Sequence, residues 1–460
     1  MSKVDLPIKK NDEITVVFED LTHDGSGVCK IDGYPIFVPH TLPGEEAIIR
    51  VIKTNKRFGF GKLVKLLTES TERVVPPCPV YGKCGGCQTQ HMSQNLQADM
   101  KKNQIEHLLQ KTARLPDVTV NPVITMDDPW HYRNKIQMPV GEKNGDIITG
   151  FYQQRSHRII DDMDACLIQQ EIGNHVLEEI RTIANELHIS AYNEQKHQGE
   201  LRHVIIRTGY QTDEVMVTFV TKTKKLSHAD LLIEKLTTKF PQITSIMHNV
   251  NMQKTNVVVG REMHTLYGND YLYDKIGNLT FGISAASFYQ VNPEQTKKLY
   301  DIVLDYANID ETETIIDAYC GIGTISLFLA QKAKKVYGIE IFKEAVEDAR
   351  KNAKLNNLTN AEFHIGAAET LMPKWKADGI NPDVIVVDPP RKGCDESLLE
   401  ALIEMDPSRI VYVSCNPSTL TRDLKILTDA QYEVKKVQPV DLFPQTHHVE
   451  CVSLLQRETI

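Results

Sequence analysis

The sequence has 460 residues, of which 41% are hydrophobic and 25% are charged. At about one domain per 100 to 200 residues, this length predicts about three domains of a soluble globular protein. The formal net charge of −9 excludes a chain that is basic throughout, so any contact with nucleic acid must come from a local patch. No apolar run of about 18 residues and no apolar N-terminal core occur, so we expect neither a membrane segment nor a signal peptide.

Residues 1–67 are predicted to form short strands separated by turns, which is typical of a small β-barrel of the oligonucleotide-binding type. Between Ala47 and Lys65 the chain carries several basic residues and no acidic one, with Phe58 and Phe60 among them. A barrel that binds RNA uses such a face, because bases stack on its aromatic rings. A solvated pair of basic strands is the alternative interpretation. The basic residues are Arg50, Lys53, Lys56, Arg57, Lys62 and Lys65.

Three of the nine cysteines, Cys78, Cys84 and Cys87, fall within ten residues of one another, which indicates a metal site rather than a secretory disulfide framework. We therefore expect the reducing cytoplasm as the compartment. The separations suit an iron–sulfur ligand loop, and a fourth thiolate is then required, for which Cys166 is the best candidate. Structural zinc also accepts four thiolates, so the residues alone leave both metals open.

Residues 68–280 contain this loop and a predicted α+β domain, in which strand-like stretches alternate with helical ones. The stretch 93–112 has helical spacing without Gly or Pro, and it is a candidate to pack on the catalytic domain. The stretch YRNK, which includes Arg133 and Lys135, is a candidate for phosphate contact or a solvated strand start.

Residues 281–460 show apolar strands alternating with helices, which predicts a parallel sheet covered on both faces. The first strand ends in a glycine turn, DAYCGIG, whose glycines allow a ligand to approach the backbone. The next strand ends at Glu340, about 20 residues downstream, where a carboxylate can accept both ribose hydroxyls of a nucleoside cofactor. Asp388 ends a later strand and is followed by two prolines, which turn its carboxylate toward the same pocket.

The motifs DAYCGIG, DPPRKG, SCNPSTLTRD and FPQTHHVE occur in this order after ASFYQVN. Together they resemble the motifs of the RNA 5-methyluridine methyltransferases, which include enzymes acting on transfer RNA and on 23S ribosomal RNA. The resemblance implies a class I methyltransferase fold, S-adenosylmethionine as methyl donor, Cys415 as nucleophile and Glu450 as general base. It also implies cofactor contacts at Gln290, Tyr319, Glu340 and Asp388.

Within this family, the cysteine loop and the N-terminal barrel resemble those of the ribosomal RNA enzymes, which carry a four-iron, four-sulfur (4Fe-4S) cluster and a TRAM barrel. The resemblance favours this cluster over zinc, with Cys78, Cys84, Cys87 and Cys166 as its ligands. It favours 23S ribosomal RNA as the substrate. We further expect a cytoplasmic monomer, because no obligate protein partner is evident from the sequence.

The proposed roles follow from the chemistry of uracil. Carbon 5 is too weakly nucleophilic to take a methyl group until a thiolate adds to carbon 6 and makes the ring an enolate. After methyl transfer, a carboxylate must remove the proton from carbon 5 so that the thiol can leave. Because the thiolate attacks the face of the ring, the uridine must leave its stack.

Several alternatives stay open from the sequence. His447 or His448 is an alternative base, although a histidine before a strand is more often structural. Asp388 can hold either the uracil edge or the methyl-donor end of the cofactor. A transfer RNA substrate is an alternative to ribosomal RNA. A protein of another class, an iron–sulfur RNA-binding regulator on a methyltransferase scaffold, is the second hypothesis.

Overall fold

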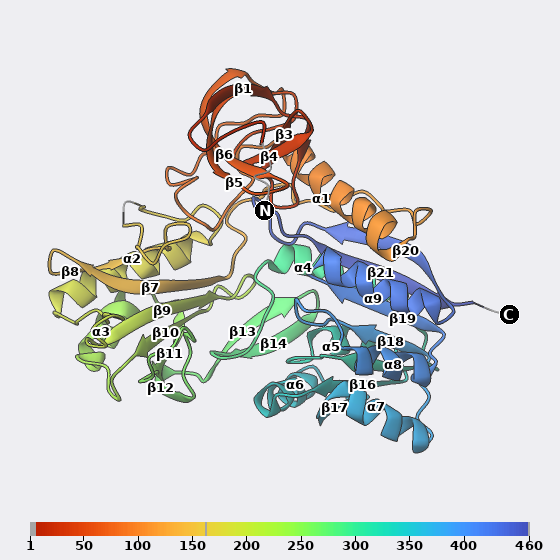
Figure 1. Cartoon of the computed structure of the whole chain (residues 1–460). Coiled ribbons are helices and arrows are strands. Elements are labelled where there is room, and N and C mark those ends of the chain that lie inside the picture. The colour runs from red at the N-terminus through yellow and green to blue at the C-terminus, as the bar shows by residue number, and fades with distance from the viewer. Residues whose placement is uncertain (1–5, 162, 459–460) are drawn as a thin grey trace.

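The computed structural model describes residues 6–161 and 163–458, which form three lobes (Figure 1). A small β lobe lies at the top, a mixed lobe at the left and a larger α/β lobe at the right. None of the helices in the described ranges is long and apolar enough to cross a membrane.

The N-terminal lobe is a six-stranded sheet in the order β1-β5-β6-β4-β3-β2, which curls into a barrel (Figure 1). Along β5 the residues Ala47, Ile49 and Val51 are fully buried, because alternate side chains of a strand point to opposite faces. One apolar core therefore fills the barrel. The strands are β1 (Glu13–Val17), β2 (Asp20–Leu21), β3 (Gly27–Ile31), β4 (Tyr34–Val38), β5 (Glu46–Thr54) and β6 (Gly59–Thr68).

The middle lobe is a six-stranded sheet in the order β12-β11-β10-β9-β7-β8, packed against two helices. Its neighbouring strands are antiparallel except β10 and β11, which are parallel. Helix α2 buries Val176, Ile180 and Ile183 at helical spacing against the sheet. The elements are β7 (Lys135–Lys143), β8 (Asp146–Thr149), α2 (Glu171–Glu186), β9 (Leu201–Thr208), β10 (Val215–Thr221), α3 (Ala229–Lys239), β11 (Ile243–Val250) and β12 (Glu262–Gly268).

The third lobe begins with a hairpin, β13–β14, and contains a seven-stranded sheet in the order β17-β16-β15-β18-β19-β21-β20. Five strands are parallel, and β21 runs antiparallel to both of its neighbours. The first five strands are β15 (Thr314–Ala318), β16 (Lys335–Glu340), β17 (Ala361–Ile365), β18 (Val384–Val387) and β19 (Arg409–Ser414). The others are β13 (Tyr271–Ile276), β14 (Leu279–Ser284), β20 (Tyr432–Val440) and β21 (Glu450–Arg457).

Helices cover both faces of this sheet, each face with its own apolar core. The first core contains residues of α4 (Pro293–Ala307), α5 (Thr324–Ala330) and α6 (Lys343–Leu355). The second contains residues of α7 (Ala368–Ala377), α8 (Glu396–Met405) and α9 (Pro417–Asp429). The strand order reverses at β15, so the loops after β15 and β18 diverge and leave a crevice at the carboxyl edge of the sheet.

Helix α1 (Gln94–Leu108) and the π-helical turn Leu109–Ala113 precede the middle lobe in sequence but pack on the catalytic lobe. Ile105 and Leu109 are buried in the same core as α9 and β20. Val120, further along, forms a β-bridge with Val437 of β20. The segment 94–120 is therefore an additional layer of the catalytic lobe.

Candidate active site

Tyr319 and Asp388 lie side by side at the switch point of the catalytic sheet. Each follows a strand directly, and the last residues of those strands, Ala318 and Val387, are register partners. The backbone N–H of Asp388 donates to the carbonyl of Ala318 at 3.5 Å. A pocket at this point is lined by Tyr319, Asp388 and Gln290, three of the four predicted cofactor contacts.

The fourth predicted contact, Glu340, ends the neighbouring strand and is bonded to the glycine turn. One of its carboxylate oxygens accepts from the N–H of Gly321 at 3.3 Å and the other from the N–H of Phe342 at 3.0 Å. Gly321 has φ of +55°, and a Cβ there would meet nothing within 4 Å, so the turn leaves open space beside Glu340.

The strand that precedes this turn, β15, carries a buried acceptor that fits a nucleoside cofactor. Asp317 is fully buried, and one of its oxygens accepts from the hydroxyl of Ser326 at 2.5 Å. The other oxygen has no hydrogen-bond partner among the described residues. Burial, with the nearby charges of Asp388 and Glu340, raises the pKa of Asp317 to about 7. A donor on a bound ligand would satisfy this acceptor.

Tyr319 is held in a left-handed backbone conformation, with φ of +68°. This conformation is uncommon for a residue with a large side chain, and such strain is kept where the surrounding structure enforces it. Tyr319 lines the pocket, and its backbone conformation could not be predicted from the sequence.

Cys415 and Glu450 come from the adjoining ends of two antiparallel strands. Ser414 of β19 and Cys451 of β21 are register partners, so Cys415 and Glu450 stand one position further on, next to each other. Glu450 is 4% exposed, and burial together with the charge of Asp388 raises its pKa to about 8. Burial and the charges of Glu450 and Asp388 raise the pKa of the Cys415 thiol to about 11. The predicted nucleophile and base are thus brought together beside Asp388.

Arg391 is a residue of this site that sequence reasoning missed. Its positive charge lowers the pKa of both Cys415 and Glu450, opposing the effect of burial. The side chain of Asn416, next to the thiol, donates to the backbone carbonyl of Arg391 at 2.9 Å. The motif DPPRKG contains Arg391 and could have drawn attention to it. The contact between its loop and the residue after Cys415, however, is visible only in the fold.

Asp423 of α9 braces the loop that carries Arg391. It is fully buried and accepts from the N–H of Cys394 at 2.9 Å and from the hydroxyl of Tyr412 at 2.6 Å. Gly393 has φ of +77°, and a Cβ there would lie 2.7 Å from the Asp423 carboxylate. Only glycine therefore lets this loop approach the helix that follows Cys415.

The segment 441–448, which leads to Glu450, is held by the cysteine loop. The carbonyl of Gln445 accepts from the backbone N–H groups of Gln88 at 3.0 Å and Thr89 at 3.2 Å. His447, one of the alternative bases, lies 3.2 Å from the side-chain oxygen of Gln88. Burial and His447 lower the pKa of His448 to about 4. The rings of His447 and His448 pack against each other, with their centroids 4.2 Å apart.

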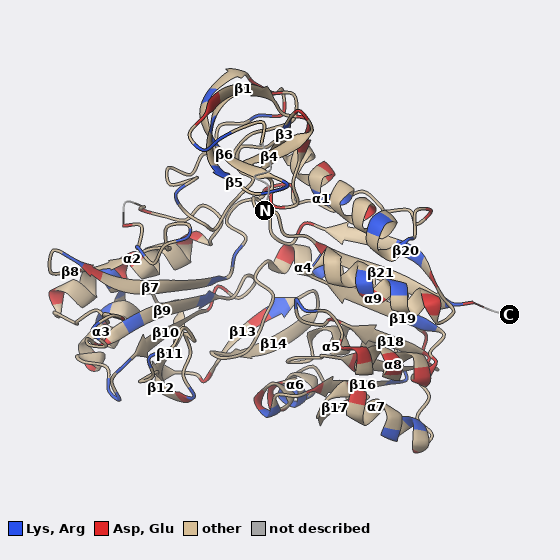
Figure 2. Cartoon of the chain, in the orientation of Figure 1, with Lys and Arg blue, Asp and Glu red and all other residues tan. Residues whose placement is uncertain are grey.

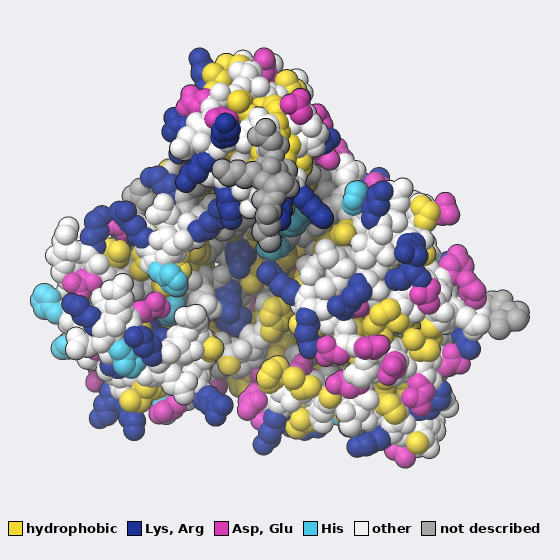
Figure 3. All heavy atoms as spheres, in the orientation of Figure 1, with side chains coloured by type: hydrophobic (Ala, Val, Ile, Leu, Met, Phe, Trp, Pro, Cys, Tyr) yellow, Lys and Arg dark blue, Asp and Glu magenta, His cyan; other side chains and the backbone are white. Residues whose placement is uncertain are grey.

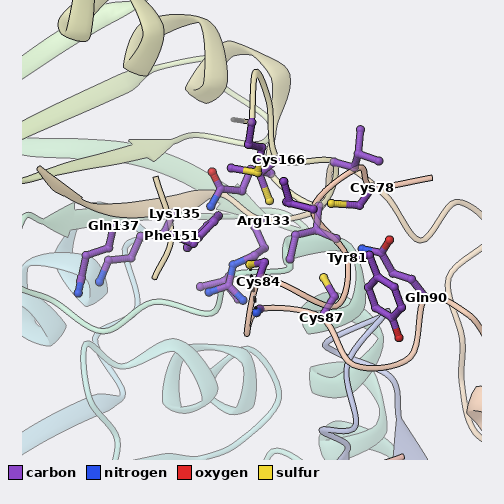
Figure 4. Close-up of a pocket in the computed structure, with 17 residues that line it drawn as sticks. Cys78, Tyr81, Cys84, Cys87, Gln90, Arg133, Lys135, Gln137, Phe151 and Cys166 are labelled. Carbon is purple, nitrogen blue, oxygen red and sulfur yellow. Dashed lines mark hydrogen bonds between the residues drawn. The ribbon is translucent and has the colours of Figure 1, made fainter. Parts of the chain in front are cut away.

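The four predicted metal ligands, Cys78, Cys84, Cys87 and Cys166, line one cavity of about 380 Å³ (Figure 4). Their Sγ atoms do not form a ligating group, and the same holds for any three His, Cys, Asp or Glu side chains in the described part of the chain. Burial raises the pKa of Cys87 to about 11 and that of Cys166 to about 12, and the other thiols of the set add to both shifts. Cys166 is buried and the other three cysteines are partly exposed, and thiols gathered around one cavity have the donor chemistry that a positively charged metal centre requires.

The basic residues of the barrel lie on β5, on β6 and in the turn between them, the same stretch that carries two rings of a cluster of three phenylalanines. The rings of Phe37, Phe58 and Phe60 lie 5.6 to 6.0 Å apart between centroids and are each partly exposed. Of the six basic residues, Arg50 pairs with Glu13, and the other five form no ion pair within the described ranges. The barrel therefore offers an aromatic and cationic surface to RNA.

Comparison with known proteins gives the family. The profile described as tRNA (Uracil-5-)-methyltransferase matches residues 93–458, and the TRAM domain profile matches residues 7–64. The chain therefore belongs to the tRNA (uracil-5-)-methyltransferase family. As a family member it is an S-adenosylmethionine-dependent RNA methyltransferase with an N-terminal TRAM domain. The predicted fold, a class I doubly wound sheet with a β-barrel and a central α+β domain, is confirmed.

Relatives of this RNA (uracil-5-)-methyltransferase match nearly all of its length. It is 58% identical to an RNA methyltransferase of Oceanobacillus iheyensis over 99% of both chains. It is 49% identical to an RNA methyltransferase of Staphylococcus epidermidis, over 98% of this chain and 99% of that one. A solved structure, the Pyrococcus abyssi tRNA (uracil-54, C5)-methyltransferase in complex with S-adenosyl-L-homocysteine, has a TM-score of 0.78 at 31% identity and covers 96% of this chain and 99% of that chain.

Proposed function

We propose that the protein methylates carbon 5 of a uridine in 23S ribosomal RNA, with Cys415 as nucleophile and Glu450 as general base. The observation that carries the proposal is the juxtaposition of this thiol and this carboxylate at the adjoining ends of β19 and β21. Asp388, at the end of β18, contributes to the pKa of both groups and so lies within their electrostatic reach.

The reaction begins when the Cys415 thiolate adds to carbon 6 of the uracil ring. Arg391 favours this step because its charge lowers the pKa of the thiol. Bound S-adenosylmethionine supplies the methyl group, which the electron-rich carbon 5 accepts. The ionised Glu450 then takes the proton from carbon 5, the ring double bond reforms, and the bond between carbon 6 and sulfur breaks to release the thiolate.

For the cofactor we propose contacts from Gln290, Tyr319, Glu340 and Asp388. Glu340, at the tip of β16, accepts hydrogen bonds from the ribose hydroxyls, as a carboxylate at this position does in other nucleoside sites. Gln290, Tyr319 and Asp388 line the pocket at the switch point. Asp388 lies between that pocket and Cys415, so it orients either the methyl donor or the edge of the uracil ring.

For the cysteine cavity we propose a 4Fe-4S cluster held by Cys78, Cys84, Cys87 and Cys166. Four thiols around a single cavity support it, and the methyl transfer balances without any electron transfer. The cluster would tie the loop that holds Gln445 to the middle lobe, because Cys166 is fixed there by hydrogen bonds to Asn174. Zinc remains the competing metal.

The proposed substrate is read from the domains that accompany the catalytic lobe. We propose 23S ribosomal RNA because the barrel and the cysteine loop accompany the catalytic lobe. We propose domain bounds of 1–67, 68–280 and 281–460, with the segment 94–120 and strand β13 of the second stretch packed on the third. We propose that the protein acts as a monomer in the reducing cytoplasm.

A covalent trap tests the chemistry. RNA that contains 5-fluorouridine, incubated with the enzyme and S-adenosylmethionine, should form an adduct stable on a denaturing gel, because fluorine cannot leave as the proton does. Cys415→Ala should abolish this adduct, whereas Cys29→Ala, at a thiol buried in the barrel, should retain it. An adduct formed by Cys415→Ala would refute the assignment.

Two further measurements test the substrate and the metal. Mass spectrometry of nucleosides should find 5-methyluridine after reaction with protein-free 23S ribosomal RNA, and methylation of transfer RNA alone would overturn this substrate. Anaerobically purified protein should contain about four iron and four sulfide per chain. Protein that contains one zinc per chain and no iron would overturn the proposed cluster and show a zinc site instead.

A further inference from the structure

Three cationic side chains lie together where the middle sheet faces the catalytic lobe. Lys135 of β7 and Arg207 of β9 are register partners, so their side chains point to the same face. Arg133 stands two residues before Lys135, and both line the cysteine cavity (Figure 4). Lys and Arg occur at the ends of β7 and β9 nearest the catalytic lobe (Figure 2) and line the hollow between the lobes (Figure 3).

Among the residues that the structure describes, none of these three side chains has an acidic partner. Within residues 6–161 and 163–458, no ion pair involves Arg133, Lys135 or Arg207. Arg207 is 4% exposed, its guanidinium donates to the carbonyl of Ser287, and its Nε has no hydrogen-bond partner in the described part of the chain. Burial and the charges of Arg207 and Arg133 lower the pKa of Lys135 to about 8. A cluster of unpaired, partly buried cations is unfavourable unless an anion binds to it.

The cluster lies next to the proposed active site. Asn134, between Arg133 and Lys135, donates its side-chain N–H to the carbonyl of Gln290 at 3.1 Å and its backbone N–H to Val291 at 3.0 Å. Tyr132, which directly precedes Arg133, donates its hydroxyl hydrogen to the carbonyl of Pro444 at 3.0 Å. The cations therefore stand between the loop that carries Gln290 and the segment that leads to Glu450.

We propose that Arg133, Lys135 and Arg207 bind a phosphate group of the substrate RNA, adjacent to the uridine that enters the crevice. Arg133 and Lys135 are partly exposed and supply the direct donors, and Arg207 adds a fixed positive charge behind Lys135. A guanidinium matches the geometry of phosphate oxygens, and phosphate contacts fix the position of RNA without reading its sequence. This inference rests on the proposed function, because it takes RNA as the ligand and the crevice as the methylation site.

The same cations line the cavity of the four cysteines, which suggests a competing explanation. A cluster bound by four thiolates carries negative charge, and Arg133 and Lys135 could serve only to neutralise it. The experiment must separate a contact with RNA from support of the metal centre.

The test measures RNA affinity as a function of salt. Fluorescence anisotropy of a labelled uridine-containing single strand, titrated with metal-loaded protein at several KCl concentrations, gives the slope of log affinity against log salt. Lys135→Gln should reduce this slope by about 0.7, the contribution of one phosphate contact to a single strand, and should raise KM for RNA more than it lowers kcat. Lys135→Arg should restore the slope.

Lys143→Gln is the matched control, since Lys143 lies at the other end of β7 and pairs with Asp161. It should keep the wild-type slope. An unchanged slope for Lys135→Gln, or loss of iron from that variant with RNA affinity retained, would overturn the phosphate site. A reduced slope with product unmethylated at carbon 5 would leave the site standing and refute only the proposed reaction.

Discussion

Lys101 of α1 and Asp441, which directly follows β20, form an ion pair of 2.6 Å in which the side chains are 0% and 4% exposed. The pair joins the helix after the cysteine loop to the start of the segment that leads to Glu450. A second link lies one helical turn earlier on α1, where the side chain of Gln97 donates a hydrogen bond to the side chain of Gln445 and accepts one from its backbone N–H. The proposed base is thus positioned by parts of the chain that lie more than 300 residues away in sequence.

Replacing one partner of this ion pair should destabilise the fold. Lys101→Met leaves the Asp441 carboxylate buried without its cation, which typically lowers the free energy of unfolding by about 3 to 5 kcal/mol. Thermal denaturation followed by circular dichroism checks the value. The double variant Lys101→Met with Asp441→Leu should recover most of the loss, and a single variant as stable as wild type would contradict the role of the pair.

Methylation should speed up as the pH rises through about 8. The pKa of Glu450 is raised to about 8, so below that pH the carboxylate is protonated and cannot accept the proton from carbon 5. The pKa of Cys415 is raised to about 11, so the thiolate fraction also increases with pH. Single-turnover rates measured from pH 6 to pH 9.5 should show this acid limb.

Arg391 should set the position of that limb. Arg391→Gln removes the charge that lowers the pKa of both Cys415 and Glu450, so the limb should move to higher pH. Arg391→Lys keeps the charge and should move it less. Identical pH profiles for wild type and Arg391→Gln would show that the guanidinium does not act on these two groups.

Loss of Glu340 should weaken the binding of cofactor without removing the nucleophile. A hydrogen bond to a charged group contributes about 1.5 to 3 kcal/mol, so Glu340→Ala should bind S-adenosyl-L-homocysteine about 10 to 150 times more weakly by titration calorimetry. Glu362→Ala, at an exposed ion pair with Lys335 on the next strand, is the control. Equal affinity in Glu340→Ala and wild type would contradict a contact between Glu340 and the ribose.

The phenylalanine rings of the barrel should contribute to RNA affinity. Stacking of a base on an aromatic ring is worth about 1 to 3 kcal/mol, so Phe58→Ala should weaken binding of single-stranded RNA about 5- to 150-fold in anisotropy titrations. Val64→Ala, at another exposed apolar residue of the barrel, should leave binding unchanged. If both variants bind RNA alike, bases do not stack on this surface.

The sequence predicted those features that depend on local pattern. The strands that end before Tyr319, Asp388 and Cys415 were each visible as an apolar run, and parallel strands bring their carboxyl ends to one edge. The role of Gln290, in contrast, came from resemblance to a known family, because its position is not one that local pattern distinguishes. Cys166 was chosen only because three clustered cysteines require a fourth thiolate.

The features that sequence reasoning missed depend on contacts between distant segments. Arg391 acts on Cys415 only because Asp423 and Gly393 hold its loop against α9. Strand β12 was not predicted, since its residues are largely exposed and lack an apolar alternation. Neither feature leaves a periodic signal in the chain.

The packing of the segment 94–120 has a practical consequence for dissecting the enzyme. A fragment cut at residue 281 would contain every strand of the catalytic sheet but would lack Ile105, Leu109 and Val120. The apolar sides of α9 and β20 would then face water, and such a surface promotes self-association. A minimal catalytic piece must therefore be assembled from two separate stretches of the gene, or joined by a linker that replaces the middle lobe.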